Sequence, residues 1–254
     1  MNKIIISKKK KEQLHETKKD IFIYNEIETI KKIKEGYSIA RFGDHELFML
    51  TGDKNQFQDY YEEIHKYLIE ILENDNPQSK LLIGIPPLCL KRDPNIKSEG
   101  IQDYWNRWVR HRKLGEYIIY LKDNTYYSSF FTQLYAYDKY YVKKIMTEIV
   151  DLWNNKNIVL FLNSQVKEKC ADVIDKLFQN VQSIKFEIVP SKNAWATHTD
   201  ILNKIKSYDN ICIILICCGV TATVIAYKAT IDGYQVIDFG QFIECIHAKY
   251  LDLL

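Results

Sequence analysis

Long apolar runs are absent from this chain of 254 residues. The longest, residues 211–218, has the length of a strand and is well short of the ~20 residues that a membrane span needs. No apolar segment of signal-peptide length precedes the lysines of residues 1–11. The sequence therefore predicts a cytoplasmic protein with at most peripheral membrane contact.

Cysteines with the spacing of a metal site are also absent. The six cysteines include no Cys-x-x-Cys pair, and none has zinc-finger spacing with histidine. Three of them lie in the apolar run 211–218, where a free cysteine behaves as a small hydrophobic residue. Reduced thiols agree with a cytoplasmic location.

A strong net charge is the third feature that is missing. Lysine and arginine total 35 against 33 acidic residues, a net charge of +2, which does not indicate a nucleic-acid partner. Residues 1–20 are the basic exception, interpreted as a solvated helix face or a frayed tail, with a weak contact to anionic lipid as the alternative. Residues 21–254 are expected to form a single domain with an ample core. The oligomeric state, a homo-oligomer included, is left open.

Short apolar, β-branched runs alternate along the chain with longer amphipathic stretches. The continuous apolar run within residues 157–162 is typical of a strand covered on both faces. Strands that alternate with helices indicate an α/β fold, a mostly parallel sheet with helices on both faces. We expect strands at residues 37–42, 80–85, 117–121, 157–162, 184–189, 211–217 and 235–238. We expect helices at residues 27–35, 57–73, 102–112, 140–153, 166–178, 194–207 and 220–232, and an irregular loop at 88–100.

The first expected strand leads into a charged group. Gly43 permits a tight exit, and Asp44 and Glu46 follow two residues apart. An extended or turning backbone points both carboxylates the same way, and paired oxygen ligands suit Mg²⁺ or Mn²⁺ beside a diphosphate. Arg41 offers a guanidinium fork to phosphate. The alternative interpretation is that the acids cap the following helix.

The strand at 184–189 ends in a turn suited to an anion. Pro190 stops the strand, and Ser191 or Asn193 can cap the helix that follows. A helix N-terminus attracts phosphate, and Lys192 adds a full positive charge there. A plain strand-to-helix turn is the alternative.

The most apolar strand is followed by a third candidate group. Gly219, Thr221 and Thr223 open the next helix and are interpreted as a phosphate or ribose cradle. The segment is neither Gly-x-Gly-x-x-Gly nor a P-loop, which argues against a dehydrogenase and against ATP hydrolysis. A close strand–helix packing turn is the alternative.

The last strand ends on Asp238, a fourth candidate, although an aspartate there can also cap a turn. All four groups follow strands. The carboxyl ends of parallel strands meet at one edge of a sheet, where ligands of α/β proteins bind. The sequence therefore predicts that the four groups gather at a single site.

The four motifs occur in a fixed order, at residues 41–46, 190–195, 219–227 and 233–240. This ordered set resembles the GT-D-type glycosyltransferases of bacterial adhesin and surface-glycan pathways, from about residue 27 onward. The resemblance implies a Rossmann-like enzyme that moves a hexose from a UDP-sugar to a glycan or glycoprotein acceptor. It implies that the Asp-x-Glu motif, Asp44 and Glu46, is catalytic and serves the donor and a divalent metal, Mn²⁺ or Mg²⁺.

Several positions depart from the family pattern. His45 replaces a glycine between the two acids, Gln133 stands where an arginine is common, and Gln241 replaces a histidine. The turn at 219–222 has valine for proline, and residues 163–167 replace a segment rich in glycine and acids. Glu244 is a candidate replacement acid, and His45 and Glu46 are candidate bases. These changes motivate a second hypothesis, a non-catalytic nucleotide-binding or complex-forming protein on the same fold.

Overall fold

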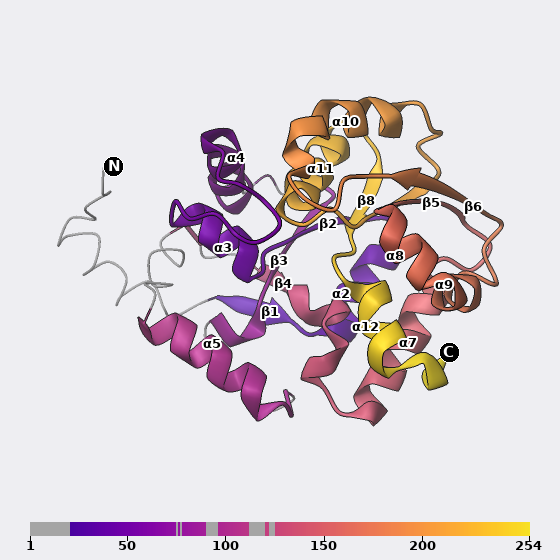
Figure 1. Cartoon of the computed structure of the whole chain (residues 1–254), viewed down its shortest axis with the longest axis horizontal. Helices are drawn as coiled ribbons and strands as arrows, with labels where there is room; N and C mark the ends of the chain where they lie inside the picture. The colour runs from indigo at the N-terminus through magenta and orange to yellow at the C-terminus, as the bar shows by residue number, and fades with distance from the viewer. Residues whose placement is uncertain (1–20, 75, 77, 90–95, 112–119, 122–124) are drawn as a thin grey trace.

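The structure, a computed structural model, describes residues 21–254 apart from 75, 77, 90–95, 112–119 and 122–124. The described residues form one eight-stranded sheet in the order β1-β4-β3-β2-β8-β7-β5-β6 (Figure 1). Every strand pair in it is parallel, which confirms the predicted α/β class. The strands are β1 (Phe22–Tyr24), β2 (Ser38–Arg41), β3 (Leu81–Ile85), β4 (Thr125–Ser128), β5 (Asn157–Leu162), β6 (Ser183–Ile188), β7 (Ile213–Ile216) and β8 (Gln235–Asp238).

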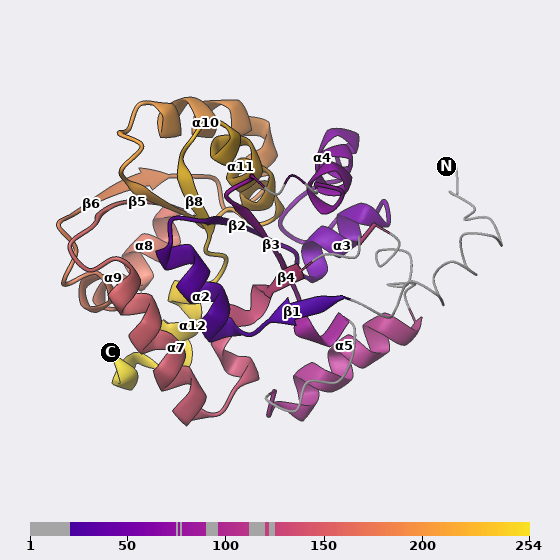
Figure 2. The same ribbon diagram turned by 180° about the vertical axis from the view of Figure 1, so that it is seen from behind.

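Helices cover both faces of the sheet. Figures 1 and 2 show α4, α10 and α11 together on one side and α2, α7 and α9 on the other. None of the helices in the described part of the chain is long and apolar enough to cross a membrane. The α-helices are α2 (Glu26–Lys34), α3 (Asp44–Leu50), α4 (Glu62–Leu72), α5 (Glu99–His111), α7 (Lys139–Leu152), α8 (Ser164–Lys169), α9 (Ala171–Leu177), α10 (His198–Lys206), α11 (Val220–Ile231) and α12 (Phe242–Lys249).

The central helix α11 is buried on most sides. Its buried residues include alanines and valines as well as Thr221 and Thr223, and a helix that is apolar all round belongs in a core. It packs against β2 and β8, and the strand before it, β7, is fully buried. This packing fixes the N-terminus of α11 at the carboxyl edge of the sheet.

The strand predicted at residues 117–121 is wrong where the structure describes it, because Tyr120 and Leu121 are not in a strand. Residues 117–119 lie outside the described residues. The sheet position beside β3 is filled instead by β4, which begins at Thr125. The edge strand β1 was not predicted, because three residues are too few to show a period of two.

The helix expected at 57–73 begins only at Glu62. The side chain of Asn55 accepts the backbone N–H groups of Phe57 and Gln58 at 2.8 and 2.9 Å, and this turn competes with helix formation.

The helix expected at 166–178 is divided into α8 and α9 at Cys170. The helices α3 and α12 were not predicted.

Candidate active site

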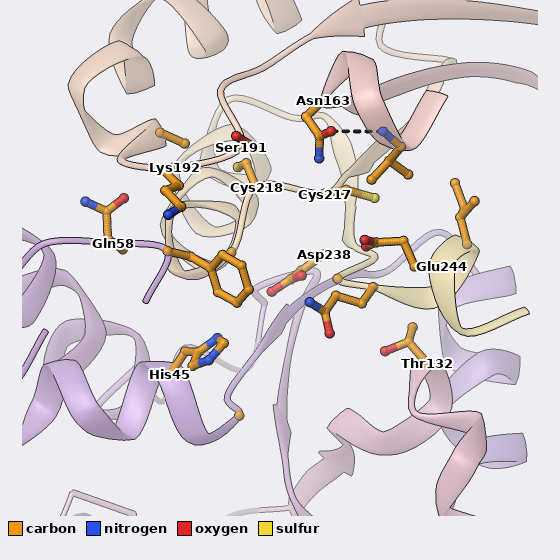
Figure 3. Close-up of a pocket in the computed structure, with 18 of the residues that line it drawn as sticks. His45, Gln58, Thr132, Asn163, Ser191, Lys192, Cys217, Cys218, Asp238 and Glu244 are labelled. Carbon is orange, nitrogen blue, oxygen red and sulfur yellow. Dashed lines mark hydrogen bonds between the residues drawn. The ribbon is translucent and has the colours of Figure 1, made fainter. Parts of the chain in front are cut away.

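A cavity of about 590 Å³ opens at the carboxyl edge of the sheet. Residues that follow β2, β4, β5, β6, β7 and β8 line it. Figure 3 shows His45, Gln58 and Lys192 around one end of the cavity, and Thr132, Asn163 and Glu244 around the other. This edge is where α/β proteins bind their ligands.

The four sequence motifs meet at this cavity. The predicted site residues that line it are Arg41, Gly43, Asp44, Glu46, Ser191, Lys192, Gly219 and Asp238. Three others do not line the cavity and instead form hydrogen bonds to nearby residues: Asn193 to Asp59, Thr221 to Gln58 and Thr223 to Asp238. The structure therefore brings together eight of the predicted residues and places the remaining three in support of them.

Asp44 and Glu46 do not point the same way, and that expectation is wrong. Both lie in the first turn of α3, where residues two apart face different sides of a helix. Glu46 is 7% exposed and accepts the backbone N–H of Gly43 at 2.7 Å, which satisfies a free donor at the helix start. Asp44 is half-buried and accepts the hydroxyl of Tyr104 at 2.9 Å. Glu46 thus caps its own helix, while Asp44 is bonded to a side chain of α5.

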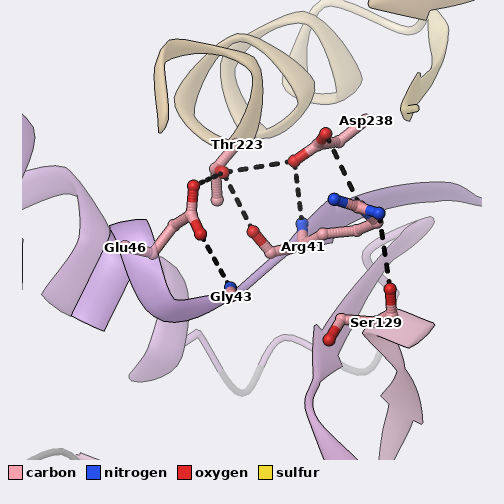
Figure 4. A network of polar contacts seen from close by, with 6 residues as sticks. All are labelled: Arg41, Gly43, Glu46, Ser129, Thr223 and Asp238. Carbon is pink, nitrogen blue, oxygen red and sulfur yellow. Dashed lines mark hydrogen bonds and ion pairs between the residues drawn. The ribbon is translucent and has the colours of Figure 1, made fainter. Parts of the chain in front are cut away.

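Arg41 and Asp238 form a buried ion pair between β2 and β8. The Nε atom of Arg41 lies 3.6 Å from Oδ1 of Asp238, and the guanidinium also donates to the carbonyl of Ser129. Figure 4 shows Thr223 between the two acids Glu46 and Asp238, and its hydroxyl oxygen lies 3.2 Å from Asp238 Oδ2. The guanidinium of Arg41 is therefore engaged with the protein itself.

Two carboxyl groups share this buried region. Burial, and then the charge of Asp238, raise the pKa of Glu46 to about 7. Burial also raises the pKa of Asp238, against the opposing effect of Arg41. Two neighbouring carboxylates with one cation resist full ionisation, so Glu46 takes up a proton near neutral pH.

We expect Glu46→Gln to remove a pH dependence of stability. The folded protein holds this proton more tightly than the unfolded chain, so wild-type stability falls as pH rises from about 4.5 towards 7. The shift corresponds to about 3 kcal/mol. Glutamine keeps the bond to Gly43 without the charge. Urea unfolding at pH 5 and pH 8 should show Glu46→Gln more stable than wild type only at pH 8, and equal differences at both would contradict this.

Lys192 is a cation without a carboxylate partner among the described residues. Its side chain is exposed and lines the cavity next to Ser191, and Figure 3 shows its nitrogen directed into the cavity. Gly219, also on the cavity wall, precedes the twelve-residue helix α11 with no side-chain cap. The uncapped N–H groups and the ammonium together provide positive charge for an anion.

Asn193 and Thr221 support the loop between α3 and α4. The side chain of Asn193 accepts the N–H of Asp59 at 2.8 Å, and Thr221 donates to Oε1 of buried Gln58 at 3.2 Å. Phe57 and Gln58 line the cavity and were not predicted. Both lay inside an expected helix, so no signal at a strand end marked them.

Away from Lys192 and His45, the cavity lining includes uncharged polar groups, Glu244 and Lys169. The positions that depart from the family pattern, Gln133, Asn163, Gln241 and Glu244, all line it. Burial raises the pKa of Glu244 while Lys169 opposes that shift. These four departures line the same cavity as His45, which also departs from the family pattern.

No cluster of three or more His, Cys, Asp or Glu side chains with metal-ligand geometry occurs in the described part of the chain. Asp44 and Glu46 both line the cavity, and of the two Asp44 has the more exposed side chain. This fits a Mg²⁺-type ion, which is commonly bound through one or two carboxylates and substrate phosphates. Glu46, turned to Gly43, does not join it in the observed conformation.

The parallel sheet and the cavity at its carboxyl edge define an α/β protein of the kind that binds ligands at strand ends. A family model described as the glycosyltransferase GT-D fold matches residues 39–248. The chain belongs to this family of glycosyltransferases.

Two streptococcal proteins are similar in sequence. Glycosyltransferase GlyD of Streptococcus pneumoniae serotype 4 is 28% identical over 210 residues, which are 82% of this chain and 25% of that protein. "Probable glycosyl transferase Gly" of Streptococcus gordonii is 25% identical over 210 residues, 82% of this chain and 30% of that protein. The matched region thus spans less than a third of the length of these relatives.

Solved structures are similar over most of the chain. A protein described as the highly conserved domain of unknown function 1792 with a distinct glycosyltransferase fold is 27% identical with a TM-score of 0.81, covering 93% of this chain and 83% of that one. A glycosyltransferase with this domain from Streptococcus sanguinis, 24% identical, has a TM-score of 0.80 and covers 89% and 83%. The second likeness supports the fold alone.

Proposed function

We propose that this chain transfers a hexose from a UDP-sugar to a glycan or glycoprotein acceptor, assisted by a divalent metal. The observation that carries the proposal is one cavity that joins Lys192, the N-terminus of α11 at Gly219 and the carboxylate of Asp44. Membership of a glycosyltransferase family supports sugar transfer. The free thiols among the described cysteines agree with a cytoplasmic reaction.

The positive charge of Lys192 and of the α11 N-terminus suits the diphosphate of the donor. Breaking the bond between sugar and phosphate develops negative charge on the leaving UDP. Lys192 and the N–H groups at the start of α11 lie where they can stabilise that charge without reorganising. Ser191 and Gly219, on the same wall, allow the phosphates to approach the backbone.

Asp44 is the residue that would hold Mn²⁺ or Mg²⁺. When bound, such an ion neutralises charge on the diphosphate. Tyr104 fixes one oxygen of the Asp44 carboxylate by a hydrogen bond. A ligand role for Glu46 stays a prediction, and its pKa of about 7 also suits a base for the acceptor hydroxyl near neutral pH.

The proposal is tested by UDP release from candidate UDP-sugars in the presence of Mn²⁺. We expect Asp44→Ala to lower turnover on the order of a hundredfold or more, because charge stabilisation in the transition state is lost. Calorimetry provides a second readout: Mn²⁺ should strengthen UDP binding to the wild type and not to Asp44→Ala.

Asp53→Ala is the matched control, because Asp53 is an exposed acid close to α3 that does not line the cavity. Its turnover should stay within about twofold of wild type, as for most surface changes. Unchanged turnover in both Asp44→Ala and Glu46→Ala would remove the proposed roles of the motif.

A second candidate function is a nucleotide-binding or complex-forming protein without transfer. Gln133 and Gln241 line the cavity where the family pattern has an arginine and a histidine, so two groups that handle phosphate and protons are missing. Tight UDP binding without UDP-sugar turnover, across a screen of glycan and glycoprotein acceptors, would favour this function.

A further inference from the structure

The loop of residues 55–59, between α3 and α4, is held from both sides. From within, Asn55 Oδ1 accepts the N–H groups of Phe57 and Gln58. From the turn after β6, the N–H of Asn193 donates to the carbonyl of Phe57 at 2.8 Å, and the Asn193 side chain bonds Asp59. The backbone of Phe57 is therefore fixed at the cavity wall.

Gln58 anchors the same loop to two other motifs. It is 3% exposed, and its Oε1 accepts the N–H of Trp195 at 3.3 Å and the hydroxyl of Thr221 at 3.2 Å. The turns after β6 and β7 thus hold the loop in place. A side chain ordered in advance loses little entropy when a ligand binds.

The ring of Phe57 is apolar but remains partly exposed at the cavity wall. Phe57 is half-buried, lines the cavity, and meets His45 edge-to-face with ring centroids 5.2 Å apart. Phe42, close in sequence, is fully buried in the core. A fixed, partly exposed ring gains from being covered by a flat apolar surface.

The groups around Phe57 indicate which flat ligand fits. Lys192, unpaired with any acid among the described residues, and Gly219 at the start of α11 share this cavity with it. Figure 3 shows Lys192 and His45 at the same end, opposite Asn163 and Glu244. A ring beside the positive charge of Lys192 and of the α11 N-terminus matches a nucleoside diphosphate, and polar groups at the far end match the hydroxyls of a sugar.

We propose that Phe57 stacks on the base of a nucleoside diphosphate, and that Asn193, Gln58 and Thr221 are positioning residues that hold its loop. This inference rests on the proposed function and sets the orientation of the donor, with the base over Phe57 and the sugar towards Glu244. Stacking tolerates any base, so Phe57 supplies affinity for the nucleoside and does not select uracil. The competing interpretation is that Phe57 only covers His45.

Calorimetry with UDP, ADP and inorganic pyrophosphate, each with Mn²⁺, tests the inference. We expect Phe57→Ala to weaken UDP and ADP binding tenfold or more, since a stacked base contributes about that much. Pyrophosphate binding should change less than twofold, and Phe57→Trp should restore nucleotide binding. Tyr60→Ala is the matched control, an exposed aromatic close by that does not line the cavity.

The outcomes distinguish failure of base stacking by Phe57 from failure of the proposed donor site itself. Equal binding of UDP and pyrophosphate by the wild type, or unchanged UDP binding in Phe57→Ala, overturns stacking and leaves the proposed function standing. Equal weakening of UDP and pyrophosphate in Phe57→Ala also overturns it, because the loop would then act on phosphate. Failure of the wild type to bind UDP, ADP and pyrophosphate removes the proposed donor site and the stacking role together.

Discussion

Replacing Arg41 with methionine should cost about 3–5 kcal/mol of unfolding free energy at pH 8, as expected when one partner of a buried pair is removed. The Arg41 and Asp238 side chains are 11% and 4% exposed, so solvent can replace the lost guanidinium only in part. The charge of Asp238 already raises the pKa of Glu46, and Arg41 is the cation that opposes the upward shift at both acids. Urea unfolding monitored by tryptophan fluorescence measures the loss.

The loss should depend on the acid that Arg41 faces. In Arg41→Met combined with Asp238→Asn, the buried charge is gone as well, and much of the stability should return. At pH 5 the single variant should lose less, because both acids can then be protonated. If Arg41→Met costs the same in the Asp238→Asn background as in the wild type, the ion pair makes no contribution.

Gly240→Ala should be the second large loss, about 2–4 kcal/mol. Gly240 has φ +54, a conformation that costs other residues about 1 kcal/mol or more. A Cβ atom there would also lie 2.5 Å from Nη2 of Arg41 and 3.0 Å from its Cζ. The guanidinium cannot simply move aside, because Asp238 and the Ser129 carbonyl hold it.

Gly233→Ala separates the two causes. Gly233 has φ +88 and nothing within 4 Å of an added Cβ, so it should lose only the conformational part, about 1 kcal/mol. In the Arg41→Met background, the cost of Gly240→Ala should approach that of Gly233→Ala. Thermal and urea unfolding of these variants provides the comparison, and equal losses at both glycines in the wild-type background would contradict the clash.

The architecture was predictable because buried parallel strands are visible as apolar runs. Residues 157–162 and 235–238 match β5 and β8 as the structure has them. The short strand β1 and the helix α3 were missed, since neither shows a period long enough to recognise. At Asn55, a side chain that takes two backbone N–H groups delayed the start of α4, and hydrophobic periodicity carries no signal for such a turn.

The position of the candidate site at the carboxyl edge of the sheet was also predictable, because the ends of parallel strands lie along one edge. The roles of particular residues were not. A spacing of two between Asp44 and Glu46 favours a shared ligand only in extended backbone, and helix α3 turns Glu46 inward. Phe57 comes from a loop between helices, and the residues that hold this loop, Asn193 at Phe57 and Thr221 at Gln58, are distant in sequence and close only after folding.

The pairing of β2 with β8 joins segments that are far apart along the chain. Arg41 and Asp238 are 197 positions apart, and the β2 edge is covered only when β8 takes its place between β2 and β7. Contacts between such distant segments form late in folding, after their loop-closure entropy has been overcome. On a ribosome, the strands β2 to β4 emerge long before their missing neighbour. The cavity should therefore be completed only after β8 has been synthesised and has paired with β2.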